Sequence, residues 1–286
     1  MLAISDDSQF LYVGMDGTSL VQRYVLPALT PDISYPLGNW DNGAPYYALD
    51  LQVAPGASHT TAVSKGVHNL EPGAVGGVFI FDDATPRPTS APGFQEYDSI
   101  QWSSDGTALY SANSETTSFD FYTLAVNASG VTLNQDYPSV FWNPGRIHLD
   151  RSNGLIYSDD GFHVIDPTTG MPVGIFEVGG GWPMAPDSSL GRVFILAQYR
   201  WQENSNYTID VFDMTHYVRV GAVPFPTTAQ PGFNQPGRFL RWGLDGLAVS
   251  FKGDKIYLLS GSFISGNRPG RSAKEKAEKG PVRPQH

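Results

Sequence analysis

Short apolar runs alternate with polar turns along most of this chain. A turn rich in Ser, Asp, Asn or Gly, followed at once by an apolar run, recurs from Ser5, Ala54, Ser103, Asp150 and Ala185. Successive starts are 49, 49, 47 and 35 residues apart, and a weaker pair of such runs occupies residues 241–261. Apolar runs bounded by these turn residues are typical of antiparallel strands in tight hairpins. The pattern predicts a small antiparallel sheet in each repeat.

Each repeat divides into four apolar segments. The first reads LAIS, FLYVGM, LVQRYVL and ISYPLG, and the third reads SIQWS, ALYSANS, SFDFYTLAV and VTLNQDY. A period of about 40 to 50 residues built from strands predicts an all-β fold, the β-propeller, in which each blade is a four-stranded sheet. We predict a propeller domain over residues 1–265, with five complete blades and an incomplete blade around residues 238–264. A six- or seven-bladed parent would complete that blade with residues preceding Met1, so we expect an incomplete ring.

Composition agrees with many short strands and turns. Charged residues are only 16% of the chain, aromatic residues are 13%, and there are 31 Gly and 22 Pro. Residues 1–266 carry 12 Lys and Arg against 26 Asp and Glu, whereas residues 267–286 carry 6 against 2. An acidic body repels polyanions, so we expect no nucleic acid as partner. The basic tail, residues 266–286, has few apolar residues and is predicted to be disordered.

Several features that the sequence lacks exclude further kinds of site and segment. The chain has no cysteine, which excludes disulfides, thiolate zinc sites and a cysteine nucleophile. It has no apolar stretch of about 18 residues, so no transmembrane segment is expected. Its first residues, MLAISDDSQFLYVG, have neither the basic region nor the apolar core of a signal peptide.

The segments LYVG, LYSA, LIYS and VIDPTTG resemble the YVTN-type β-propeller repeats of bacterial surface and secreted proteins. The resemblance extends over about residues 1–265. It implies the WD40-like propeller architecture and, for the parent protein, an extracellular or cell-surface location. It does not imply one function, because this fold supports enzymes, binding proteins and scaffolds.

Catalytic and metal-binding signatures are missing. We find no Gly-x-Ser-x-Gly, His-Glu-x-x-His, phosphate-binding loop or dinucleotide fingerprint, and the six histidines have no metal-ligand spacing. The acidic pairs at residues 6–7, 82–83 and 159–160 are interpreted as turn formers. We therefore predict no metal and no cofactor. Among the histidines, only His148, on the predicted inner strand RIHLD, is a candidate for chemistry, and the alternative is a histidine that is merely hydrogen-bonded in the channel.

The connections that lead into each inner strand should surround one mouth of the central channel. They carry aromatic residues, and two of them end in Pro-Gly-Arg. The predicted ligand-binding residues are Trp40, Tyr47, Asp50, Tyr97, Asp98, Trp142, Arg146, His148, Trp182 and Arg238, with Tyr46, Phe94 and Phe233 as further aromatic residues of these loops. Such a rim suits stacking on a sugar or gripping a peptide. The alternative is structural: the aromatic rings pack between blades, and the charges form a buried network.

These observations favour a non-enzymatic, monomeric binding or scaffold module of an exported bacterial protein, with a glycan, peptide or protein ligand at the channel mouth. The alternative is a lactonase-type hydrolase acting in the channel. The sequence PGRIHLD resembles the Pro-Arg-His signature of those propellers through Arg146 and His148, although an extra residue separates the two. A third possibility is a scaffold whose exposed last blade docks a neighbouring domain.

Overall fold

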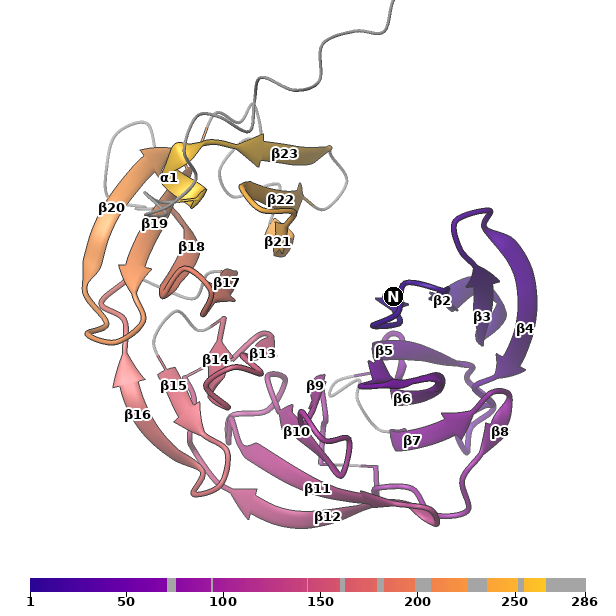
Figure 1. Cartoon of the computed structure of the whole chain (residues 1–286). Coiled ribbons are helices and arrows are strands. Elements are labelled where there is room, and N and C mark those ends of the chain that lie inside the picture. Colours follow the sequence, from indigo (N-terminus) through magenta and orange to yellow (C-terminus); the bar gives the residue numbers. More distant parts are fainter. Residues whose placement is uncertain are drawn as a thin grey trace, which may run out of the picture.

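Six antiparallel sheets follow one another in sequence order along an arc, each running from an inner strand to an outer strand (Figure 1). The structure is a computed structural model. It describes residues 1–70, 76–93, 95–142, 144–159, 163–178, 183–198, 207–225, 236–251 and 255–265. The predicted basic tail lies outside these residues, as do Phe94, Trp182 and Phe233.

The first three blades each have four strands paired in chain order. Blade 1 contains β1 (Leu2–Ile4), β2 (Phe10–Met15), β3 (Leu20–Val25) and β4 (Thr30–Pro36), with a 3-10 turn, η1 (Asp16–Thr18), between β2 and β3. Blade 2 contains β5 (Tyr46–Ala54), β6 (Ala57–Val67), β7 (Gly77–Asp82) and β8 (Thr85–Pro86). Blade 3 contains β9 (Ser99–Trp102), β10 (Ala108–Ala112), β11 (Phe121–Asn127) and β12 (Gly130–Tyr137).

The next two blades repeat this order, and the last sheet has three strands. Blade 4 contains β13 (Ile147–Leu149), β14 (Ile156–Ser158), β15 (His163–Asp166) and β16 (Met171–Ile175). Blade 5 contains β17 (Met184–Asp187), β18 (Arg192–Gln198), β19 (Tyr207–Asp213) and β20 (Arg219–Pro224). Blade 6 contains β21 (Pro236–Trp242), β22 (Gly246–Phe251) and β23 (Ile256–Ser260), followed by the short helix α1 (Ser262–Ser265). The prediction of five complete blades and one incomplete blade is confirmed.

The recurring turn has the same chemistry in blades 1 and 3. Ser5 Oγ donates to Asp7 Oδ1 at 2.6 Å, and the backbone N–H of Gln9 donates to the same oxygen at 3.0 Å. Ser103 Oγ donates to Asp105 Oδ1 at 2.7 Å, and the N–H of Thr107 donates to it at 3.1 Å. A short acidic side chain that satisfies the turn's own N–H groups explains why the motif recurs between the first two strands of a blade.

The hydrophobic core lies between blades. One cluster joins the facing sides of blades 1 and 2 around Tyr12 and Leu51, and others join blades 2 with 3 and blades 3 with 4. The largest cluster joins blades 4, 5 and 6 around Phe176, Phe194 and Val249. Blades 2 to 5 therefore each pack an apolar face against the blade on either side.

The arc is open between its first and last sheets (Figure 1). Exposed apolar residues occur on both of these sheets, including Leu2 at 63% and Ile4 at 56% in β1, and Ile256 at 72% and Leu258 at 66% in β23. The expectation of an incomplete ring is therefore met. No helix among the described residues is long and apolar enough to cross a membrane.

Candidate functional site

The inner strands bring residues that are far apart in the sequence to one channel. Asp50 on β5 of blade 2 is fully buried, and its Oδ1 lies 3.3 Å from Nη1 of Arg146 and 3.7 Å from Nη2 of Arg238. Oδ1 also accepts from the N–H of Leu51, and Oδ2 accepts from the N–H of Ile100 on blade 3, both at 3.0 Å. A fully buried carboxylate requires such pairing. Three of the predicted site residues, Asp50, Arg146 and Arg238, therefore form one network.

This channel network extends to the first residue of the chain. Nη2 of Arg238 lies 2.8 Å from the Sδ of Met1, and Nη2 of Arg146 lies 3.9 Å from the same sulfur. Burial and the nearby Arg146 lower the pKa of Arg238, while Asp50 and Asp159 act in the opposite direction. The two guanidinium groups thus share one protein carboxylate, Asp50, and this contact connects blades 2, 4 and 6.

His148 forms a separate pair at the edge of this network. Its Nε2 lies 2.7 Å from Oδ1 of Asp159, which also accepts a hydrogen bond from the N–H of Met184 at 2.9 Å. The imidazole is about one fifth exposed. Asp159 therefore orients His148 and joins blade 4 to the first strand of blade 5.

Asp98 directly precedes β9, whereas Asp50 lies within β5, and the side chain of Asp98 points to a different environment. Its Oδ2 accepts hydrogen bonds from the N–H and the Oγ of Ser114, the latter at 2.8 Å, and from the N–H of Glu115 at 3.1 Å. Burial and the carboxylates of Glu115 and Glu96 raise the pKa of Asp98 to about 7 against these hydrogen bonds. Asp98 thus holds the β10–β11 connection of its own blade.

Some of the predicted aromatic residues pack inside the protein, and others lie at its surface. Tyr97 is fully buried in the core between blades 2 and 3, 5.2 Å from the ring of Tyr122. Tyr47 is half-buried and stacks on His68 at 3.9 Å. Trp40 is half-buried, whereas Trp142 is 77% exposed. Trp182 lies outside the described residues.

Exposed acidic residues accompany the aromatic residues at the end of the blades where the connections lead into the inner strands. Three of them lie on connections between strands at this end: Asp16, Asp41 and Glu115. Asp16 approaches His68 at 3.7 Å, which links blade 1 to the Tyr47 stack on blade 2. We call Trp40, Tyr47, Trp142 and these three acids the mouth set. Among the residues that the structure describes, no group of three His, Cys, Asp or Glu side chains is arranged to hold a metal ion.

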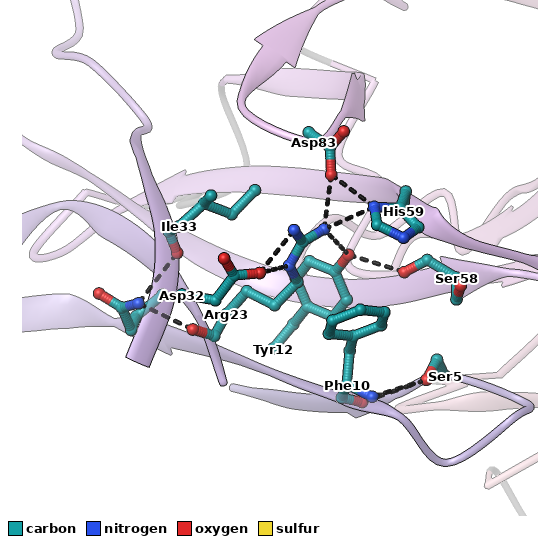
Figure 2. Close-up of polar contacts among 10 residues, drawn as sticks. Ser5, Phe10, Tyr12, Arg23, Asp32, Ile33, Ser58, His59 and Asp83 are labelled. Atoms are coloured by element: carbon teal, nitrogen blue, oxygen red, sulfur yellow. Dashed lines mark hydrogen bonds and ion pairs between the residues drawn. The ribbon is translucent and has the colours of Figure 1, made fainter. Parts of the chain in front are cut away.

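Sequence reasoning missed a second charged network, which joins blades 1 and 2 through Arg23 (Figure 2). Arg23 is nearly fully buried, with Nε 2.7 Å from Oδ2 of Asp32 and Nη1 2.6 Å from Oδ1 of Asp83. His59 Nδ1 lies 2.7 Å from the same Asp83 oxygen, and the guanidinium lies 4.5 Å above the Phe10 ring. The one available signal was a cation inside the apolar strand LVQRYVL. The network connects blade 1 to blade 2.

The comparisons with known proteins concern the fold. No protein-family model matches the sequence, and no curated protein matches it significantly. A chain in a crystal structure of a mitotic checkpoint complex is similar at a TM-score of 0.66 and 14% identity, covering 91% of this chain and 73% of its own. The β-propeller domain of Myceliophteria thermophila Cps50 (Swd1) is similar at 0.63 and 13% identity, covering 91% and 82%. The computationally designed Ika8 protein is similar at 0.57 and 12% identity, covering 93% and 71%. The chain thus has a WD40-like β-propeller fold.

Proposed function

We propose that this chain is a non-enzymatic interaction module that binds a basic peptide segment of a partner protein at the channel mouth. One observation carries this proposal: the mouth set combines exposed and half-buried aromatic rings with three exposed acids, and both arginines of the channel already contact the carboxylate of Asp50. Aromatic residues provide large contact areas at low entropic cost, and acidic residues select cations. We further propose a YVTN-type, exported bacterial parent and a monomeric module.

The charge of the chain supports a basic ligand. The net charge is −10, and residues 1–266 contain more than twice as many acidic as basic residues. Such a field attracts cationic partners and repels anionic ones, and the attraction weakens as salt screens it. Among the similar structures, the chain of a mitotic checkpoint complex comes from a protein assembly, which is consistent with protein binding.

The proposal is tested with an array of Lys- and Arg-rich peptides alongside neutral glycans. We expect the peptides to be retained, with an affinity that falls as the salt concentration rises. Trp142→Ala should lower the affinity for the most tightly bound peptide at least tenfold. The matched control is Trp242→Ala, an exposed tryptophan on the last blade. Retention of glycans alone, or binding that Trp142→Ala and salt leave unchanged, would contradict the proposal.

A second candidate, a lactonase-type hydrolase, is favoured by the His148–Asp159 pair at 2.7 Å with Arg146 two residues away. A histidine oriented by a carboxylate is suited to general base catalysis. A panel of lactones assayed with the wild type and His148→Ala separates the two functions. Hydrolysis that depends on His148 supports the enzyme, and equal background rates in both proteins reject it.

A further inference from the structure

Two carboxylates of blade 3 each keep one oxygen buried without a hydrogen-bond partner. Among the described residues, three buried side-chain atoms lack a partner, and two of them are the carboxylate oxygens Oε2 of Glu96 and Oδ1 of Asp98. Glu96 is only 3% exposed, and Asp98 is half-buried. A buried carboxylate oxygen without a partner is costly, and buried charges in proteins are normally paired or bind a metal ion. These two oxygens are therefore candidate ligands for a cation.

Both carboxylates belong to the segment that leads into β9, and both contact the connection between β10 and β11. The N–H of Asp98 donates to the carbonyl of Glu96 at 3.0 Å, so the two residues are held in one tight turn. Oδ2 of Asp98 accepts hydrogen bonds from the backbone N–H groups of Ser114 and Glu115. Thr116, on the same connection, hydrogen-bonds to the carboxylate of Glu96. The two unpartnered oxygens thus lie where this turn meets the β10–β11 connection.

The charged groups that act most strongly on these two carboxylates are themselves acidic. Burial is the largest cause that raises the pKa of both groups, and the carboxylate of the exposed Glu115 raises both further. The buried Asp120, at the end of the same connection, also raises the pKa of Glu96. Both oxygens of Asp120 already accept hydrogen bonds, from the N–H of Ser139 and the hydroxyl of Tyr122. Acidic groups gathered in this way repel one another, and a bound cation removes that repulsion.

We propose that Glu96 and Asp98 bind one Ca²⁺ ion between this turn and the β10–β11 connection. Ca²⁺ takes about six to eight oxygen ligands in a flexible geometry and combines carboxylates, carbonyls and water. Oε2 of Glu96 and Oδ1 of Asp98 supply the anionic ligands. The connection that carries Thr116 and Glu115 borders the ion, and water completes its shell. This inference goes beyond the proposed function and departs from the sequence-based expectation of no metal.

Other cations fit these observations less well. Structural zinc sites use Cys and His ligands, whereas both ligands here are carboxylates. Mg²⁺ requires a near-ideal octahedron and keeps several waters, which suits an open site better than two buried oxygens. The ammonium group of a partner's lysine reaches neither oxygen without displacing the chain, because both are shielded from solvent. No third acidic or histidine side chain of the described residues completes a metal-binding group, so we expect a weak site, with a Kd of about 0.1 to 1 mM.

The test titrates CaCl₂ into the full chain, treated first with a chelator, and follows the heat of binding and the melting temperature. We expect one ion per chain, a melting temperature that rises by a few degrees in about 10 mM CaCl₂, and slower amide hydrogen exchange in the β10–β11 connection. Glu96→Gln and Asp98→Asn should each weaken Ca²⁺ binding at least tenfold. In chelator both variants should be at least as stable as the wild type, because each removes a buried charge. Loss of binding is thereby separated from loss of folding.

The matched control is Glu177→Gln, which removes an exposed acid from the connection between blades 4 and 5 and should leave Ca²⁺ binding unchanged. MgCl₂ at the same concentration controls for screening of the acidic surface and should raise the melting temperature less. The proposal is overturned by a wild type that Ca²⁺ does not stabilise, by an equal effect of Mg²⁺, or by Ca²⁺ binding that survives in either Glu96→Gln or Asp98→Asn. No peptide is present in this experiment, so its result is independent of the proposed function.

Discussion

Asp98→Asn should stabilise this protein at neutral and alkaline pH. The carboxylate of Asp98 is in a costly position, because Oδ2 accepts hydrogen bonds from Ser114 and Glu115, while Oδ1 is buried with no hydrogen-bond partner in the described part of the chain. Burial is the largest cause that raises its pKa from 3.8 to about 7. Asparagine keeps an acceptor for the N–H groups of the loop and carries no charge.

The sign and size of the effect follow from linkage. The unfolded chain ionises Asp98 near pH 3.8 and the folded chain near pH 7, so the folded state holds more protons between these values. The free energy of unfolding therefore falls as pH rises through this window, and the loss remains above it. A difference of about three pKa units corresponds to about 4 kcal/mol. The Asn variant should recover up to about 4 kcal/mol at pH 8 and almost nothing at pH 4.

Urea denaturation of wild type and Asp98→Asn at pH 4, 6 and 8 measures this difference directly. The matched control is Asp105→Asn, because hydrogen bonds from Ser103 and Thr107 lower the pKa of Asp105. That variant should be less stable than wild type at pH 8. An Asp98→Asn protein that is no more stable than wild type at pH 8, or whose advantage is the same at every pH, would refute the reasoning.

Three further predictions concern connections between and within blades. Arg23→Ala should lower the free energy of unfolding by about 2 to 3 kcal/mol in urea titrations, because it leaves Asp32 and Asp83 without their buried cation; a loss below about 0.5 kcal/mol would count against the network. Lys65, whose Nζ donates to the carbonyl of Leu37 at 2.8 Å, has a pKa lowered to about 8 by burial. Wild-type stability should therefore rise between pH 8 and 10, and Lys65→Met should flatten that rise. Gly130→Ala should lower the melting temperature by several degrees, because Gly130 has φ of +133° and its Cβ would collide with the Thr89 carbonyl; an unchanged melting temperature would show that β12 shifts freely.

The sequence predicted many residues of the candidate site, but it did not predict which of them contact one another. The sequence predicted similar places for Asp50 and Asp98, yet Asp50 lies within β5 and pairs with channel arginines, whereas Asp98 precedes β9 and holds a loop. Successive side chains along a strand point to opposite faces of the sheet, so a shift of one residue turns a side chain to the other face. Tyr97 lies in the core while Trp142 lies on the surface, and both stand in connections outside the strands, where alternation predicts neither outcome.

The sequence by itself determined the architecture. Turn residues such as Asp7 and Asp105, and the apolar runs that follow them, are local features, so the repeat, the blade number and the incomplete last blade could be predicted without contacts. Only the tertiary structure decided which distant side chains meet. The pairing of Asp50 with Arg146 and Arg238, the Arg23 network and the exposed apolar residues of the first and last blades depend on how blades are placed around the axis. That placement is a property of the whole ring, and no single repeat encodes it.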